Sequence, residues 1–378
     1  MPPPSLLTIP LEVRAMIIIE VAVAPQTSPP SPSDLHGQNR RTLDRDVTGA
    51  YEETDRVFFQ ADAPSNPVLP LLLTNRQLHA ETLDTLRRAF STTTTTRATN
   101  PLSYTAHVIY LKNATLWPTW LSVPIQASHI DTLHAQFRIF PCPEGKEMPE
   151  ASARGSMFRA GPGVPAAIVW PFWHLLIGSL CSGTHSPCGI PFSVGRLVLN
   201  FVPVQYPGDD DDKKQDGGYH GYGAGAGEGA SSDGGSSAQR VYGPIIPEFF
   251  VPHLRLHTQG KLGKSSGMDA AARLMSFALE KIEYMAKLDA VIFDLGKKLH
   301  ENIGVVEIRL DGEVFETLDL ARYLDEKEAI KKWRATNRRT LRRKDWRWET
   351  DFLAWKKEVE ARRRELGMEA GEKKVSKS

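Results

Sequence analysis

The chain has 378 residues, of which 41% are hydrophobic, and a formal net charge of +1. This apolar fraction suffices for a sizeable core, and the near-neutral charge argues against a globally basic nucleic-acid binder. Three cysteines without a secretory signal indicate a reducing compartment, and no apolar run is long enough to span a bilayer. We therefore expect a cytoplasmic or nuclear protein, with room for two or three domains.

The first predicted element is a helix within residues 6–23, LLTIPLEVRAMIIIEVAV. Pro10 suits its first turn, and Thr8 is the candidate cap. The apolar side chains, Leu11, Ile17 and Ile18 among them, point nearly all round the helix. Such a helix is expected to be buried on several sides. Residues 24–66 follow; they are rich in Pro, Ser, Asp and Arg, and we expect an exposed insertion that is mostly loop.

The second predicted helix covers residues 71–90, LLLTNRQLHAETLDTLRRAF. Its apolar face at 3.6 residues per turn comprises Leu71, Leu72, Leu78, Leu83, Leu86 and Phe90. Two polar residues, Asn75 and His79, fall within this face as satisfied core groups or as a docking point. Each helix has apolar surface that it cannot bury alone, so we expect the two helices to pack together. The charges suggest a link between Glu12 and Arg76, or between Arg14 and Glu81.

Residues 100–325 predict a body of strands and helices. A strand is expected at 104–111, the Trp-Pro-Thr-Trp segment 117–120 should turn the chain, and residues 130–140 alternate with the period of two of a half-buried strand. A buried helix at 171–180 and a strand at 196–202 follow. Residues 207–240 consist mainly of Gly, Asp, Ser and Ala, and we expect a disordered linker.

The later part of this body predicts one long helix over residues 268–301 and then a hairpin. The hairpin strands are residues 305–310 and 314–318, and Asp311-Gly312 between them favours a type I′ turn. Strands that alternate with helices indicate a mixed sheet with helical layers.

A basic helical tail is expected at residues 326–378. Trp348, Phe352, Trp355 and Val359 form a narrow apolar stripe in it. Before this stripe lies a basic cluster that comprises Arg338, Arg339, Arg342, Arg343 and Lys344. The cluster could bind nucleic acid or serve as a nuclear import signal. The alternative is a solvated helix whose charges pair with neighbouring acids.

Motifs for catalysis or for cofactor binding are weak. Residues 260–265 lack the first glycine of a phosphate-binding loop, because Thr258 stands at that position. His174, Cys181, His185 and Cys188 match the spacing of no zinc module, so buried thiols and surface histidines are favoured. No nucleophile elbow or paired acid–base spacing is present. We predict no catalytic, cofactor-binding or metal-binding residues, and a protein that is not an enzyme.

Two motifs carry a resemblance to a family. Residues 7–14 read Leu-Thr-Ile-Pro-Leu-Glu-Val-Arg, and residues 72–81 read Leu-Leu-Thr-Asn-Arg-Gln-Leu-His-Ala-Glu. Together they resemble the two signatures of a largely uncharacterised family of fungal F-box-like proteins, over most of residues 1–325. Asn75 replaces the usual Cys, and Ile17-Ile18-Ile19 replaces the usual Ile-Tyr-Glu.

The resemblance implies an α+β fold in which F-box-like helices, in residues 1–92, pack on a mixed sheet-and-helix body. It also implies a protein-interaction module, such as a substrate adaptor that binds the linker protein of a ubiquitin ligase. The candidate partner-binding residues are Pro10, Leu11, Ile17 and Ile18. The alternative function is a nuclear, nucleic-acid-associated protein that acts through the basic tail.

Overall fold

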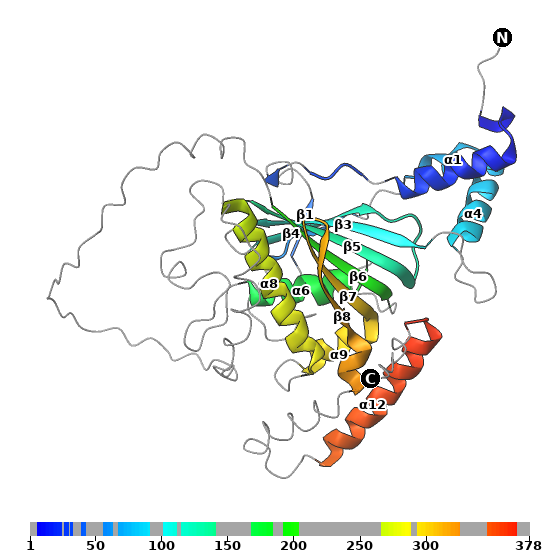
Figure 1. Cartoon of the computed structure of the whole chain (residues 1–378). Helices are drawn as coiled ribbons and strands as arrows, with labels where there is room; N and C mark the ends of the chain where they lie inside the picture. Colours follow the sequence, from blue (N-terminus) through cyan, green and yellow to red (C-terminus); the bar gives the residue numbers. More distant parts are fainter. Residues whose placement is uncertain are drawn as a thin grey trace, which may run out of the picture.

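The structure is a computed structural model that describes residues 6–24, 26–29, 31–32, 39–42, 56–62, 67–90, 101–111, 115–140, 168–183, 192–203, 266–288, 293–325 and 346–368. These residues form an α+β fold in which helices pack against a mixed six-stranded sheet (Figure 1). The α+β class expected from the sequence is therefore confirmed.

The sheet has four parallel strands in its centre and one antiparallel strand at each edge. Its strands are β3 (Ser103–Leu111), β4 (Thr115–Ser122), β5 (His129–Phe140), β6 (Ser193–Val202), β7 (Ile303–Leu310) and β8 (Glu313–Asp319). Their spatial order is β4-β3-β5-β6-β7-β8, and β3, β5, β6 and β7 are parallel. The predicted strands at 104–111, 130–140 and 196–202 are therefore confirmed.

The parallel strands are joined by helices that lie on one face of the sheet. Helix α6 (Val169–Leu175) continues into the π-helix η4 (Leu176–Leu180) between β5 and β6; α8 (Ser266–Ala286) and α9 (Phe293–Asn302) connect β6 to β7. Right-handed crossovers that progress in one direction place their helices on the same face. Phe172 of α6 contacts Phe277 of α8 with ring centroids 5.9 Å apart, which agrees with this arrangement.

The core lies between this helix layer and the inward side chains of the strands. Leu133 pairs with Leu197, and Leu197 pairs with Val306, so one apolar row crosses three parallel strands. Four residues further along the same two strands, Phe137 stacks on Phe201 with ring centroids 4.8 Å apart. This alternation confirms the period of two predicted for residues 130–140.

The segment that contains the two tryptophans at 117 and 120 is a strand and not the turn that we predicted. Pro118 belongs to the edge strand β4 and lies opposite Val108 of β3. An edge strand tolerates proline because its missing N–H need not interrupt a ladder. Trp120 joins the main core, whereas Trp117 stacks on Phe58 at 4.5 Å.

The insertion is less exposed than expected, because its described parts cover β4. Val57 is fully buried and bridges to Leu116, and the N–H of Phe58 donates to the carbonyl of Leu116 at 2.9 Å. The short strands β1 (Arg40–Arg41) and β2 (Phe59–Gln60) pair with each other in the same region. These contacts occupy the outer side of β4.

The predicted hairpin between β7 and β8 is confirmed. Asp311 and Gly312 both have positive φ, 49° and 84°, as a type I′ turn requires. The N–H of Gly312 also donates to Oδ1 of Asn200 on β6 at 2.9 Å. The turn is therefore attached to the neighbouring parallel strand.

The single long helix predicted over 268–301 is wrong. The chain leaves the helix at Leu288, whose φ is +54°, and α9 begins at Phe293. Gly296 permits α9 to fold back, since a Cβ there would lie 2.5 Å from the carbonyl oxygen of Met285. Nε2 of His300 makes a hydrogen bond of 2.8 Å with the carbonyl of Ala286. The contacts of Gly296 with Met285 and of His300 with Ala286 therefore outweigh the continuous helical pattern of the sequence.

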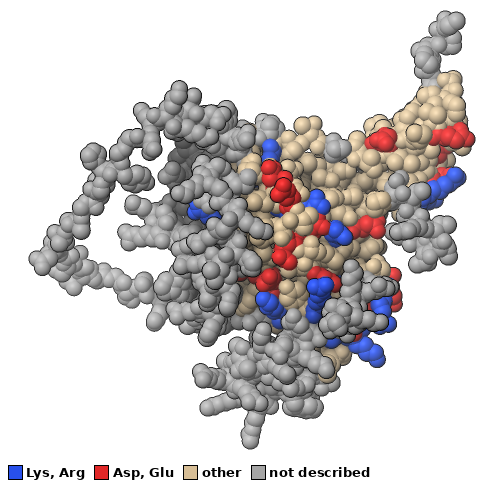
Figure 2. All heavy atoms as spheres, viewed as in Figure 1, with Lys and Arg blue, Asp and Glu red and all other residues tan. Residues whose placement is uncertain are grey.

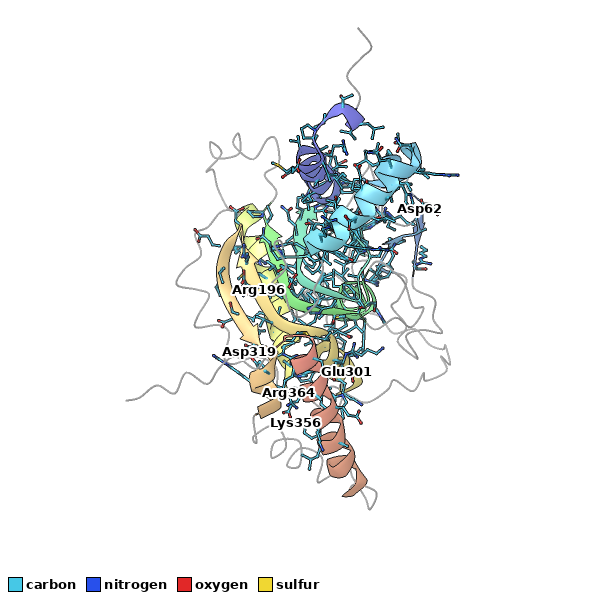
Figure 3. The ribbon with its side chains drawn as sticks, turned by 90° about the vertical axis from the view of Figure 1, so that its right-hand side faces the viewer. Asp62, Arg196, Glu301, Asp319, Lys356 and Arg364 are labelled. Carbon is cyan, nitrogen blue, oxygen red and sulfur yellow. The ribbon has the colours of Figure 1, made fainter. Side chains whose placement is uncertain are left out.

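The C-terminal helix is part of the folded body and not the separate tail that we expected. Helix α10 (Leu320–Asp325) follows β8, and α12 (Trp346–Glu365) packs near α9 (Figure 3). Its predicted apolar stripe is confirmed at three positions: Phe352, Trp355 and Val359 are buried in a cluster with Leu288 and Leu324. The indole N–H of Trp355 donates to Glu301 at 2.8 Å.

Arg363 attaches α12 to the C-terminal end of α9. It is only 3% exposed, and its guanidinium donates to the carbonyls of His300, Ile303 and Gly304 at 2.6–3.0 Å. The carbonyl of His300 lies in the last turn of α9, where carbonyls lack intrahelical partners, and Ile303 and Gly304 begin β7, so Arg363 holds α12 at the junction of these two elements. Burial lowers the pKa of Arg363, and the charge of Asp319 acts in the opposite direction.

Arg363→Met should destabilise the fold by about 2–4 kcal/mol, because it leaves buried carbonyls without a donor. The matched control is Arg364→Met at the next position, where the side chain is exposed; its effect should stay within about 0.5 kcal/mol. Urea unfolding of both variants measures the difference. Equal stability of the two variants would show that α12 does not depend on this contact.

Candidate protein-binding surface

Helix α1 (Leu11–Val23) is buried along one stripe only. Its buried residues are Arg14, Ile18 and Ala22, which recur every four residues and so share one face. Ile18 and Ala22 join the main core of the sheet and helices. The expectation that α1 is buried on several sides is therefore wrong, and its opposite face is left to solvent.

An ion pair holds α1 against α4 (Arg76–Phe90). Nε and Nη2 of Arg14 each donate to one carboxylate oxygen of Glu81 at 2.8 Å. Nη1 of Arg14 also donates to the carbonyls of Leu7 and Ile9 at 3.1 and 2.6 Å. Packing of the two helices and the link between Arg14 and Glu81 are therefore confirmed, whereas Glu12 forms no such pair with an arginine of α4 in the described chain.

The predicted helix over 71–90 is divided at Asn75 into α3 (Leu69–Thr74) and α4. Asn75 has extended backbone angles, and its Oδ1 accepts a hydrogen bond of 2.9 Å from the N–H of Leu78. This is the geometry of an N-cap. Nδ1 of His79 contacts the carbonyl of Leu72 at 3.0 Å across the break. Both polar residues are exposed, so their predicted place within the buried face is wrong.

The face of α1 that points away from α4 carries large apolar side chains. Val13 is 43% exposed, Met16 66% and Val23 38%, and we call these three residues the α1 outer face. Glu12 and Glu20 lie beside them and are also exposed. Further exposed apolar residues near the start of α1 and on α3 are Leu7, Leu11, Leu69 and Leu73. Figure 2 shows a largely uncharged surface over this part of the molecule, with charged groups near its margin.

The four predicted partner-binding residues divide between surface and core. Pro10 and Leu11 are exposed, with Pro10 at the N-cap position before α1. Ile17 is half-buried, and Ile18 is only 1% exposed, so the prediction for Ile18 is wrong. Sequence reasoning missed Val13 and Met16, which are identified only once Arg14 is known to face α4.

A second polar group of residues lies on the sheet face that the crossover helices leave free. Glu307 of β7 accepts hydrogen bonds of 2.6 Å from Arg196 of β6 and from Arg309 of β7. Burial alone would raise the pKa of Glu307, but the bonds from Arg309 and Arg196 outweigh it and lower that pKa. Burial and then Arg309 lower the pKa of His134 on β5, and Glu307 partly offsets them. Because the carboxylate of Glu307 accepts hydrogen bonds from Arg196 on β6 and from Arg309 on its own strand, it links β6 to β7.

Cys181 and His174, two of the four residues considered as zinc ligands in the sequence, are buried near η4. Burial raises the pKa of the Cys181 thiol to about 12, so this thiol stays protonated at neutral pH. His185 and Cys188 lie outside the described residues. Within the described chain no group of three or more His, Cys, Asp or Glu residues is placed to hold a metal ion.

The basic cluster Arg338, Arg339, Arg342, Arg343 and Lys344 lies outside the described residues, as does the linker expected at 207–240. On the face seen in Figure 2, acidic and basic side chains of the described residues are intermixed. No helix among the described segments has the length and apolar character needed to cross a membrane.

Comparison with known proteins gives no family model, no curated protein and no solved structure that matches the chain. The α1 outer face is therefore assessed by its geometry alone. It is apolar, the part-buried ion pair of Arg14 and Glu81 holds its helix in place, and its described neighbours do not cover it. A surface with these properties is suited to bind another protein.

Leu78→Ala should lower the free energy of unfolding by about 2–4 kcal/mol, because it opens a cavity at a buried position of α4. Leu78 is 3% exposed, whereas Leu73 on α3 is 76% exposed and gives the matched control. Leu73→Ala should change stability by less than about 0.5 kcal/mol. Chemical denaturation decides the matter, and similar losses for both variants would contradict the burial of α4 as described.

Glu81→Gln should remove part of the acid sensitivity of the protein. The hydrogen bond from Arg14 is the main cause that lowers the pKa of Glu81 below its ordinary 4.5. The unfolded chain then binds a proton at a higher pH than the folded chain does, so this contribution is present above the unfolded pKa and is lost as the pH falls through the folded pKa.

Thermal unfolding followed from neutral pH down to acid pH measures this contribution. The wild type should lose more stability than Glu81→Gln over the acid range. Asp84→Asn is the control, because Asp84 pairs with Arg88 at the exposed surface of the same helix. A Glu81→Gln variant with the pH profile of the wild type would show that the ion pair is not formed in solution.

Proposed function

We propose that the chain is a protein-interaction module that presents the α1 outer face to a partner, as a substrate adaptor of a ubiquitin ligase presents its helix to the linker protein. The observation that carries the proposal is the exposure of Val13, Met16 and Val23 on a helix whose other face is fixed to the body. The F-box-like resemblance of residues 7–14 and 72–81 supports the same conclusion.

The attachment of α1 explains why the apolar face stays outside. Arg14 donates to Glu81 and to two carbonyls at once, and rotation of α1 about its axis would break both hydrogen bonds from Arg14 to Glu81. The helix is therefore fixed in one orientation, and a partner meets a preformed surface that needs little ordering.

Charge indicates which partner surface fits. Exposed Glu12 and Glu20 accompany the three apolar residues. An apolar groove with basic residues at its rim is complementary to such a surface, since rim charges raise the rate of association and set the orientation. The linker protein must therefore offer an apolar groove for Met16 and Val13 and cations near the acids of α1.

Met16→Asp should abolish a complex with the ligase linker protein, because it places a charge in the middle of the apolar contact. The loss should be at least about 30-fold in affinity, as for a central contact residue worth about 2 kcal/mol. Leu353→Asp is the matched control, since Leu353 is an exposed leucine, 50% accessible, on α12 at the other side of the molecule. Co-expression followed by co-purification measures both variants beside the wild type.

Met16 is a better probe than Ile17, whose half-buried side chain also contributes to folding. Melting temperatures of Met16→Asp and Leu353→Asp should match that of the wild type, so loss of the complex reports binding alone. Absence of a wild-type complex, or equal losses in both variants, would rule out the adaptor function.

A further inference from the structure

The two edge strands of the main sheet, β4 and β8, differ in whether other described segments form hydrogen bonds with them. At β4, the N–H groups of Phe58 and Gln26 donate to the carbonyls of Leu116 and Leu121 at 2.9 and 2.7 Å. At the other edge, no strand within the described residues pairs beyond β8. Unpaired peptide groups along an edge strand are a template on which another strand can form hydrogen bonds.

The side chains of β8 are also accessible. Glu313, Val314, Glu316 and Thr317 are all exposed, with Val314 at 57%. The hairpin turn at Asp311-Gly312 holds the strand against β7, so the edge is rigid before anything binds to it. A rigid edge lowers the entropy that a partner strand must lose with it on association.

The charges of β8 define which strand can pair with it. The strand EVFETLD contains three acids and no base. Asp319 accepts the N–H of Ala321 at 3.0 Å and thereby caps α10, whereas Glu313 and Glu316 make no ion pair with any described residue. Like charges directly opposite each other destabilise paired strands. A second copy of β8 would set acids against acids, and a lysine-bearing strand would set bases against them.

We propose that β8 binds an extended, basic peptide segment of a partner protein as an added strand. Main-chain hydrogen bonds to the edge supply the attraction. Glu313 and Glu316 pair with Leu310 and Ile308, two positions apart on β7, so the register shift puts both acids on one face, where they select lysine or arginine at alternating positions. The register shift between Ile308 and Arg309 interrupts the regular ladder of β7 and β8, so the segment that an added strand can pair with is short. This site is separate from the α1 outer face and does not depend on the function proposed for it.

The test uses the full chain and a fluorescent twelve-residue peptide in which Lys alternates with Val and Thr. Fluorescence anisotropy gives its affinity for the wild type, for the β8 variant Glu313→Lys/Glu316→Lys, and for the control variant Glu12→Lys/Glu20→Lys. The two variants change net charge by the same amount. We expect the β8 variant to bind at least about tenfold more weakly than the wild type, and the control to bind as the wild type does.

A second peptide distinguishes an added strand from simple attraction between charges. It keeps every lysine, but alternate backbone amides carry a methyl group, so it cannot donate to the edge. This peptide should lose binding at least about tenfold, and the unmethylated peptide should slow amide exchange in β8. Equal binding of the methylated peptide, equal binding by the β8 variant, or no binding by the wild type would overturn the proposal. Met16→Asp, which tests the α1 outer face, should leave peptide binding unchanged, so each proposal can fail alone.

Discussion

Two crossovers in succession, from β5 to β6 and from β6 to β7, impose the arrangement on which the remaining structure depends, since such connections are almost always right-handed. Because both progress in the same direction, their helices cover a single face of the sheet. The rows through Leu133 and Phe137 meet those helices and form the core, while the alternate positions, such as His134 and Arg196, are left on the other face. The edges then had to be antiparallel hairpin strands, since β3–β4 and β7–β8 are joined by short connections. Described parts of the insertion contact one edge, β4, whereas no strand of the described segments pairs with the other edge, β8.

A small number of contacts determines the position of α1. Only one stripe of α1 is buried. Within it, the bidentate pair of Arg14 and Glu81 fixes the rotation of the helix, and Ile18 and Ala22 supply buried apolar area. An all-round apolar helix is normally a buried helix, yet α1 lies at the margin of the fold, where α4 covers one side. Val13 and Met16 are exposed as a consequence. The surface proposed for partner binding is thus defined by the ion pair on the opposite side of the helix.

Features that depend on local pattern were predictable from the sequence. The alternation in residues 130–140 and the Asp311-Gly312 turn gave β5 and the hairpin, because side-chain period and positive φ are local properties. Features set by distant contacts were not. The break at Leu288 depends on the approach of Gly296 to Met285, and the burial of Arg363 depends on carbonyls some sixty positions earlier. At the candidate surface, the resemblance named Pro10 and Leu11, which are exposed, but it did not indicate Val13 and Met16. Ile18 was misassigned, since only the partner of Arg14 shows which side of α1 is covered.

The α1 outer face and the β8 edge lie far enough apart to act independently. Helix α1 meets the sheet at β4, where Oγ of Ser122 donates to the carbonyl of Val23. Five strand spacings separate β4 from β8, a width of about 24 Å. Charges at physiological ionic strength are screened over about 8 Å, so Glu313 and Glu316 exert little influence on Glu12 and Glu20. Substitutions at such a separation are expected to add. A protein with two independent contact surfaces on one rigid sheet can hold two partners at a fixed distance, which is the geometry that an adaptor requires.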